Sequence, residues 1–293
     1  LLLFIGIGAM IDFGPLLEKP WLMLFGAAAQ FGIFITLVLA GLFFYLPDAA
    51  SIAVIGAADG PTAIFVANSL GSKYLGAIMV AAYSYMALVP IVQPPVIKLC
   101  TTRKERLIRM PYKKGSVSKT TKILFPIVVT VLAGLVAPAS VALVGFLMFG
   151  NLLRECGVLN ALSETAQNVL ANLITIVLGL TVAGQMTADK FVQPDTLLIL
   201  ALGLVAFVFD TVGGVLFAKL LNLFLPEGKK INPMIGAAGI SAFPMSGRVV
   251  NQMGLAEDNQ NFLLMYSISV NVSGQIASVI AGGLILTLMN GYV

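Results

Sequence analysis

Histidine is absent from this sequence of 293 residues, and charged residues and cysteine are scarce. Without histidine, the chain lacks the commonest general base and the commonest ligand for transition metals. Its two cysteines, Cys100 and Cys156, are far apart and match neither a CxxC motif nor a zinc-binding pattern, so we expect free thiols. Any catalysis must therefore use Asp, Tyr, Arg, Ser, water or a cofactor.

Charged residues make up only 10% of the chain, whereas 59% of the residues are hydrophobic and the mean hydropathy is +0.99. A soluble domain carries about 25% charged residues, so this composition indicates a polytopic membrane protein. Several apolar runs approach or exceed the roughly 20 residues that span a bilayer, and such runs imply helices. We therefore expect an all-α fold with helices near residues 1–14, 21–46, 74–97, 123–139, 141–153, 166–187, 196–224 and 261–290.

The sequence starts inside an apolar run, LLLFIGIGAM, without an initiator Met or a charged n-region. This start does not match a signal peptide. We expect the chain to be a fragment of a longer protein with additional N-terminal segments.

A basic segment at residues 98–122 holds nine of the 17 Lys and Arg residues, opposed only by Glu105. The positive-inside rule predicts a cytoplasmic loop, and a count of spans from it puts the C-terminus outside. The loop is either a topology signal alone or a docking site for an acidic partner or lipid headgroups. Its basic content is too local, and too poor in interleaved aromatic residues, to suggest nucleic acid. Its basic residues are Lys98, Arg103, Lys104, Arg106, Arg109, Lys113, Lys114, Lys119 and Lys122.

An internal repeat links two interrupted segments, near 50–72 and 231–255. The tetrapeptide Ile-Gly-Ala-Ala at 55–58 recurs at 235–238, and each copy is followed by a Tyr-Ser pair that opens an apolar helix. The span count gives the two copies opposite orientations. We therefore predict inverted structural repeats, each with a broken or re-entrant helical hairpin, a pattern that marks the binding site of many transporters.

The repeat predicts three regions in an elevator-transporter-like architecture. The first inverted repeat occupies residues 1–115 and contains the broken hairpin near 50–72. Connecting spans occupy residues 116–165. The second repeat occupies residues 166–293 and contains the broken hairpin near 231–255.

Asp59 lies in the first interrupted segment, IGAADGPTAIFVANS. An Asp at the centre of a bilayer costs about 2.5–3.5 kcal/mol, so an idle one is disfavoured there. Pro61 removes a backbone donor and breaks the helix, which frees carbonyl groups beside the carboxylate. This arrangement suits a hard cation, whereas the alternative is an ordinary Asx turn at the membrane surface.

The second interrupted segment, INPMIGAAGISAFPMSGRVVNQMG, offers complementary groups. Asn232 precedes a proline, so its amide oxygen either binds an ion or caps a helix. Gly236 permits close backbone approach, and Ser241 adds a hydroxyl. Arg248 is either an anchor for a carboxylate or other anion, or a cation that extends to the membrane interface.

Several other polar residues lie inside predicted spans. Asn271 is either an ion ligand or a partner in interhelical hydrogen bonding. Tyr83 and Tyr85 both suit an interfacial aromatic belt, but Tyr85 lies deeper and has no basic neighbour. Because the chain has no histidine, Tyr85 is also a candidate proton donor. Asp12 suits a helix terminus, and Asp210 has no assigned role. From the residues alone, we predict an ion-coupled transporter with a Na⁺ or H⁺ site where the two hairpins meet, at Asp59 and Asn232, and an anion site near Arg248.

The same motifs resemble the β-subunit of the biotin-dependent sodium-translocating decarboxylases, which act on oxaloacetate, methylmalonyl-CoA, glutaconyl-CoA or malonate. The resemblance covers essentially the whole chain. Its most specific parts are GAADGPTAIFVA, the basic loop continuing into SKTTKILFPIVVT, GNLLRECGV and NPMIGAAGISAFPMSGRV.

The resemblance implies a membrane carboxybiotin decarboxylase of the prokaryotic cytoplasmic membrane, which couples decarboxylation and proton consumption to outward Na⁺ transport. It implies a carboxytransferase α-subunit, a biotin carrier protein or domain and a small γ or δ membrane subunit as partners. Biotin would be carried by a partner, the oligomer would be a trimer, and no nucleic acid would be involved.

The resemblance also implies roles for matching residues. Asp59 would bind Na⁺ and exchange protons, with Asn232, Ser241 and Asn271 completing the coordination. Tyr85 would form a hydrogen bond or donate a proton nearby. Gly236 would permit the tight hairpin at the carboxybiotin site, and Arg248 would meet the carboxybiotin.

Two alternatives explain part of the pattern. A Na⁺-coupled secondary transporter of an organic anion would use the same hairpins without decarboxylase activity. A membrane anchor that only assembles other subunits would tolerate the loss of the Asp59 carboxylate.

Overall fold

The computed structural model describes residues 1–112, 115–185, 187 and 192–290, and within these ranges every regular element is a helix. Six helical stretches in these ranges are long and apolar enough to cross a membrane, which confirms the predicted all-α polytopic class. They are Pro20–Ala40, Leu75–Cys100, Lys119–Val136, Asn160–Gly184, Pro194–Phe224 and Leu264–Met289. Lys113 and Lys114 of the predicted basic loop, and the C-terminal Val293, lie outside the described residues.

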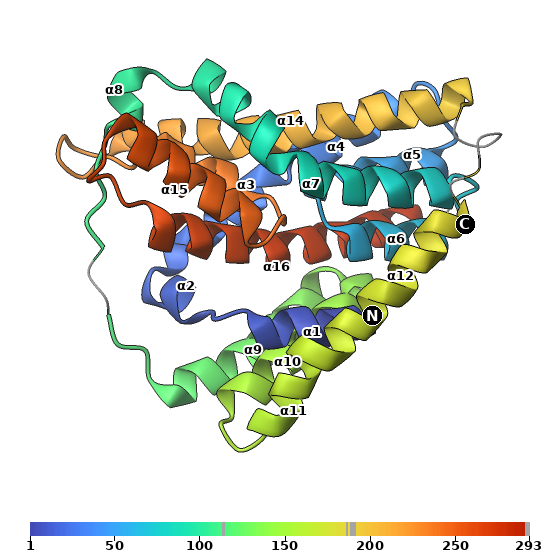
Figure 1. Cartoon of the computed structure of the whole chain (residues 1–293), viewed down its shortest axis with the longest axis horizontal. Coiled ribbons are helices and arrows are strands. Elements are labelled where there is room, and N and C mark those ends of the chain that lie inside the picture. The colour runs from blue at the N-terminus through green and yellow to red at the C-terminus, as the bar shows by residue number, and fades with distance from the viewer. Residues whose placement is uncertain (113–114, 186, 188–191, 291–293) are drawn as a thin grey trace.

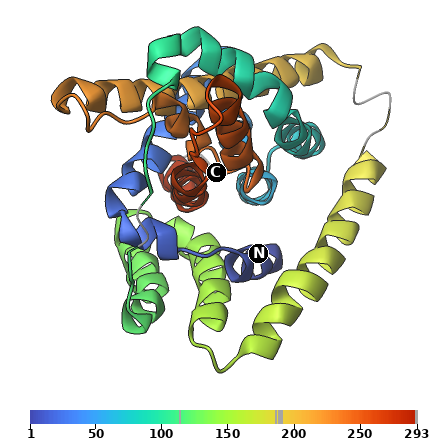
Figure 2. The same ribbon diagram turned by 60° about the vertical axis from the view of Figure 1, so that its left-hand side comes forward.

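Two groups of helices make up the fold (Figures 1 and 2). The first group surrounds the interrupted segments and contains α3 (Met23–Ala29), α4 (Phe31–Ala40), α5 (Leu46–Ala53), α6 (Gly60–Ser69), α7 (Leu75–Cys100), α14 (Pro194–Phe224), α15 (Met245–Glu257) and α16 (Leu264–Met289). The second group contains α1 (Leu2–Met10), α9 (Lys119–Val136), α10 (Val141–Glu155), α11 (Asn160–Glu164), the π-helical turn Thr165–Leu170 and α12 (Ala171–Gln185). The inverted orientation of the repeats, the three predicted regions and an elevator-like motion stay predictions.

Helix α1 packs closely on α10, far from it in sequence, and this contact holds the second group together. A Cβ added at Gly8 would lie 1.8 Å from the Leu147 carbonyl oxygen, and one at Gly150 would lie 2.0 Å from the Ile5 carbonyl oxygen. Glycines at these two positions therefore let the backbones touch, as small residues do between membrane helices.

The predicted single helix at 21–46 is divided at Gln30 into α3 and α4. The Gln30 amide donates to the Gly26 carbonyl at 3.0 Å, so the side chain folds back onto α3. The Asp210 carboxylate on α14 accepts the Ile33 backbone N–H at 3.2 Å. A carboxylate at this place satisfies a donor in the first turn of α4, which stabilises the break in the same way as an N-cap.

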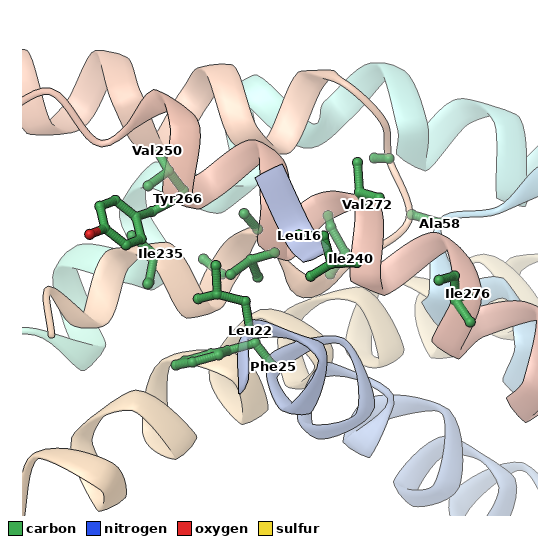
Figure 3. Close-up of a cluster of buried hydrophobic side chains, with 14 of the residues drawn as sticks. Leu16, Leu22, Phe25, Ala58, Ile235, Ile240, Val250, Tyr266, Val272 and Ile276 are labelled. Atoms are coloured by element: carbon green, nitrogen blue, oxygen red, sulfur yellow. The ribbon is translucent and has the colours of Figure 1, made fainter. Parts of the chain in front are cut away.

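The second interrupted segment shares an apolar core with α16, as Figure 3 shows, whereas most buried apolar residues of the first segment lie in a separate cluster. Leu22 and Phe25, from the N-terminal part of the chain, belong to the same cluster as Ile240 of the second segment and Val272 of α16. Ala58 of the first segment belongs to this cluster as well. This core therefore holds the second break against α16 and joins it to the first break at Ala58.

An apolar groove with a volume of about 450 Å³ lies between the two helix groups. Its walls come from α3 and α4, from α9 and from α16. The two groups are therefore incompletely packed against each other along this line. Elsewhere, the cysteines Cys100 and Cys156 are both free, which confirms the expected thiols.

Candidate functional site

The first break begins where α5 runs into a 3₁₀ turn at Val54–Ala57. Ala58 then adopts a left-handed conformation with φ 51°, and Asp59 is extended before α6 starts at Gly60. Pro61 suits this start because the first turn of a helix leaves its N–H groups without intrahelical partners. A left-handed alanine costs about 1–2 kcal/mol, so the surrounding core imposes this conformation on the chain.

Asp59 caps α6 and is almost fully buried, with 3% of its surface exposed. Its Oδ2 accepts hydrogen bonds from the Thr62 hydroxyl at 2.7 Å and the Ser278 hydroxyl at 3.0 Å. Within the described ranges, no Lys or Arg forms an ion pair with this carboxylate. A buried carboxylate with hydroxyl partners and no protein cation is a group that takes up a proton or a small cation.

The second break is a longer 3₁₀ segment, Pro233–Gly239, followed by an extended stretch and then α15. It meets the first break at Ser241, whose backbone N–H donates to the Ala57 carbonyl at 3.0 Å. The Ser241 hydroxyl donates to the Gly274 carbonyl of α16 at 2.9 Å. The two breaks therefore meet at Ala57 and Ser241, within two residues of Asp59.

Two side-chain amides on α16 hold the second break at this meeting point. Asn271 donates to the Ile240 carbonyl at 2.6 Å, and Gln275 donates to the Ser241 carbonyl. The amide oxygens of Asn271 and Gln275 are buried and have no hydrogen-bond partner among the described residues. Hence one face of α16 carries two free amide oxygens and the Ser278 hydroxyl, which together suit a cation that prefers oxygen ligands.

Tyr83, rather than Tyr85, is the tyrosine beside Asp59. A Cβ added at Gly60 would lie 2.7 Å from Cζ of Tyr83, and the buried Tyr83 hydroxyl has no partner among the described residues. Tyr85 instead donates to the Leu200 carbonyl of α14. The sequence offered two tyrosines two residues apart, and such residues point in different directions on a helix.

Asn232 is the predicted site residue that these contacts do not bring to Asp59. Its Nδ2 donates to the carbonyls of Arg106 and Ile108, at 2.8 and 2.9 Å. Its Oδ1 accepts the Met234 N–H at 3.1 Å, which is the helix-capping alternative. A role in ion binding for Asn232 stays a prediction.

The remaining predicted residues occupy separate places. Gly236 lies against α14, where an added Cβ would be 2.0 Å from the Gly214 carbonyl oxygen, so close helix packing requires glycine there. Arg248 is exposed on α15, and no ion pair joins its guanidinium to a described residue. An exposed, unpaired guanidinium is suited to an anion that arrives from outside the chain.

Asp12 and Asp210 each accept a backbone N–H group in the first turn of a helix. Asp12 accepts the Gly14 N–H at 2.8 Å where α2 (Gly14–Glu18) begins, which confirms the expected helix terminus. Asp210 is fully buried beside Gly56 of the first break, and besides capping α4 it leaves Oδ2 without a partner among the described residues.

Much of the basic loop is paired with acidic groups of the chain itself. Arg106 lies 2.6 Å from the Glu257 carboxylate, and Arg109 lies 2.5 Å from that of Asp258. The hydrogen bond from Arg109 holds the pKa of Asp258 below its usual value. The loop is therefore attached to the end of α15 and is only partly available to a partner.

These features define a polytopic helical membrane protein with a buried carboxylate at the meeting point of two interrupted helices. The chain belongs to the family of Na⁺-transporting oxaloacetate decarboxylase beta subunits, whose sequence profile matches residues 1–289. This finding confirms the resemblance noted in the sequence.

Curated relatives match nearly the full chain. It is 55% identical to the oxaloacetate decarboxylase beta chain of Klebsiella pneumoniae, over 98% of this chain and 67% of that protein. It is 52% identical to the methylmalonyl-CoA decarboxylase subunit beta of Propionigenium modestum, over 98% of this chain and 72% of that protein. The corresponding subunit of Veillonella parvula is 48% identical, over 99% of this chain and 78% of the relative.

Proposed function

We propose that this chain is the membrane subunit of a sodium-pumping, biotin-dependent decarboxylase. It couples the decarboxylation of carboxybiotin, which consumes a proton, to outward movement of Na⁺. The observation that carries the proposal is Asp59, buried without a protein cation at the junction of two breaks and close to free amide oxygens. Family membership supports the same conclusion.

Na⁺ and H⁺ compete for Asp59 in this mechanism. Sodium prefers oxygen ligands, and Asp59, Ser241 and Asn271 supply carboxylate, hydroxyl and amide oxygens near the junction. Ser278 adds a hydroxyl that already contacts the carboxylate. Because a carboxylate holds either ion, uptake of a proton at Asp59 releases Na⁺, and loss of that proton prepares the site for the next Na⁺.

Tyrosine and arginine side chains complete the proposed chemistry. Carboxybiotin on a partner would supply the carboxyl group that is released as CO₂. Arg248 would bind that carboxylate, since its guanidinium is exposed and lacks an acidic partner among the described residues. Gly236 would support this site by fixing the second break on α14. Tyr85 was predicted to donate a proton near Asp59, and the contact of Tyr83 with Gly60 favours Tyr83 for that role.

The complex would include a carboxytransferase α-subunit, a biotin carrier protein or domain and a small γ or δ membrane subunit, and the oligomer would be a trimer. The basic loop would face the cytoplasm and the C-terminus the outside. The elevator-like movement would displace the two helix groups relative to each other along the apolar groove between them. We keep Asn232 as a predicted Na⁺ ligand, although its hydrogen bonds go to Arg106, Ile108 and Met234.

A Na⁺-coupled anion transporter is the second candidate, because the exposed Arg248 would bind a free carboxylate equally well. Avidin distinguishes the two candidates, since it blocks a biotin-dependent decarboxylase and leaves a plain transporter unaffected.

The decisive measurement is CO₂ release from carboxybiotin by the full-length native complex in detergent, titrated with NaCl and compared with Asp59→Asn. We expect Na⁺-stimulated, avidin-sensitive release in the wild type. The variant should lose the Na⁺ dependence and nearly all activity, because a neutral amide cannot exchange H⁺ for Na⁺. If the intact wild-type complex releases no CO₂, the decarboxylase proposal is wrong. Full activity of the variant would support an anchoring role instead.

A further inference from the structure

Arg106, in the basic loop at 98–122, forms hydrogen bonds with several elements of the fold through both its side chain and its backbone. It closes the short helix α8 (Arg103–Arg106) and only 13% of its side chain is exposed. Its Nε donates to the Glu257 carboxylate at 2.6 Å, and its Nη1 donates to the Thr101 carbonyl at 2.7 Å. The side chain thus joins the C-terminal end of α7 to the C-terminal end of α15.

The backbone carbonyl of Arg106 makes two further links. It accepts the amide of Asn232 at 2.8 Å and the amide of Asn261 at 2.9 Å. Asn232 precedes the second break, and Asn261 precedes α16. One residue therefore connects the ends of four elements, namely α7, the 3₁₀ segment Pro233–Gly239, α15 and α16.

This arrangement holds the chain on both sides of the second interrupted segment, residues 231–255, at a single point, because Asn232 lies at its start and Glu257 follows its end. The middle of the same segment carries Ser241, which contacts Ala57, and Ile240, which contacts Asn271. Between its ends and its middle the segment is packed in the core, where Ile235, Ala237, Ile240 and Val250 are buried. Because a close-packed segment transmits displacement, the position of Arg106 sets the position of Ser241.

We propose that Arg106 is a positioning residue for the ion site, through which the loop at 101–110 holds the second break against Asp59. Asn232 belongs to the same linkage and acts through its two N–H donors. This inference rests on the proposed Na⁺ function. A partner that docks on the loop would then act on the ion site mechanically, by moving the ends of the second segment.

The test compares Arg106→Gln with Arg109→Gln in the full-length native complex. Arg109 is the matched control because it pairs with Asp258, the residue after Glu257, yet it is more exposed and its hydrogen bonds go to Asp258 and Gln260. We expect Arg106→Gln to raise the Na⁺ concentration for half-maximal activity by about tenfold or more, since charged hydrogen bonds of this kind are strong. Arg109→Gln should change it less than about twofold, as exposed ion pairs contribute little.

The apparent affinity for Na⁺ separates positioning from simple stability. A purely structural role would reduce the amount of folded complex and leave the half-maximal Na⁺ concentration of the surviving enzyme unchanged, which would overturn the proposal. If Arg106→Gln fails to fold, Glu257→Gln tests the same link from the other side. Arg106→Lys should recover only part of the affinity, because lysine lacks the fork that reaches Glu257 and Thr101 together.

Asn232→Asp distinguishes the linkage from direct ion binding. Aspartate offers two carboxylate oxygens to a cation. It lacks the N–H groups that asparagine donates to the carbonyls of Arg106 and Ile108. Weakened Na⁺ affinity supports the linkage, whereas unchanged or tighter affinity would mean that Asn232 is an ion ligand and would overturn this part of the proposal. The wild type provides the remaining control: if thermal unfolding of the wild-type complex does not respond to NaCl, the proposed Na⁺ site itself fails, independently of Arg106.

Discussion

The two interrupted segments share the tetrapeptide Ile-Gly-Ala-Ala but are built differently. The first is short and places its left-handed Ala58 directly before Asp59, whose carboxylate is held by hydroxyl groups. The second is a longer 3₁₀ segment without a carboxylate, and its carbonyls accept hydrogen bonds from α16. The first break therefore supplies the charge, whereas the second supplies backbone groups and a connection to the loop.

The largest effect should come from filling the space where the second break touches α14. Gly236→Ala places a Cβ 2.0 Å from the Gly214 carbonyl oxygen, a backbone atom that cannot move aside. We expect a loss of about 3 kcal/mol or more in the free energy of unfolding, at the upper end of overpacking substitutions. The measurements are the yield and the thermal unfolding of the full-length chain in detergent.

Two other glycines make this test a comparison. Gly56→Ala in the first break meets the Ala206 side chain at 2.6 Å and should destabilise somewhat less than Gly236→Ala. Gly179→Ala in α12 meets nothing within 4 Å and should be neutral or stabilising by up to about 1 kcal/mol. Equal effects at Gly236 and Gly179 would contradict the close approach of the second break to α14.

A smaller effect, on the apparent affinity for Na⁺, is expected from removing the hydroxyl of Ser278, which contacts the first break, or of Ser241 in the second break. Ser278→Ala removes a donor to the Asp59 carboxylate, and we expect the apparent affinity for Na⁺ to fall about tenfold. Ser241→Ala removes a hydroxyl whose hydrogen bond goes to a neutral carbonyl, so a fall of about threefold is expected. Na⁺ titration of activity measures both. A larger loss in Ser241→Ala would reverse the order and make Ser241 the principal hydroxyl ligand.

The smallest expected effect is on the pH dependence of the unfolding temperature, through the ion pair of Arg109 and Asp258 that follows α15. The hydrogen bond from Arg109 lowers the pKa of Asp258 in the folded protein below its ordinary value of 3.8. This pair therefore stabilises the fold above pH 3.8, and the contribution is lost as the pH falls through the lowered pKa. Asp258→Asn should slightly reduce the unfolding temperature at neutral pH and should match the wild type at the acidic end. A difference that persists in acid would rule out the ionised pair as its source.

Much of the architecture could be predicted from the sequence. Long apolar runs predicted the membrane-spanning helices, and α7, α14 and α16 begin and end within three residues of the expected bounds. The Asp-Gly-Pro and Asn-Pro motifs located both breaks, because proline and glycine act on the backbone locally. The break at Gln30 was missed, since the group that stabilises it, Asp210, comes from a helix about 180 residues away.

The residues that form the candidate ion site could be predicted only in part. Asp59, Ser241 and Asn271 were expected together, and the structure brings them into neighbouring contacts. Ser278 and Gln275 were not singled out, although both lie on the face of α16 that Asn271 defines, three to four residues apart. That spacing was the available signal. The contacts of Arg106 could not be predicted from its side chain, because two of the four elements that it joins are bound by its backbone carbonyl.

Local patterns in the sequence are enough to establish a helical membrane protein, to locate two of its helix breaks and to identify the carboxylate in one of them, because hydropathy and backbone restrictions act over a few residues. Three further facts emerge from the packing of the whole chain: Ser241 rather than Asn232 meets the first break, Tyr83 rather than Tyr85 lies beside Asp59, and Arg106 joins four helix ends. These facts depend on which faces of distant helices pack together. That choice is made by burial and hydrogen bonding across the whole core, and no local pattern encodes it.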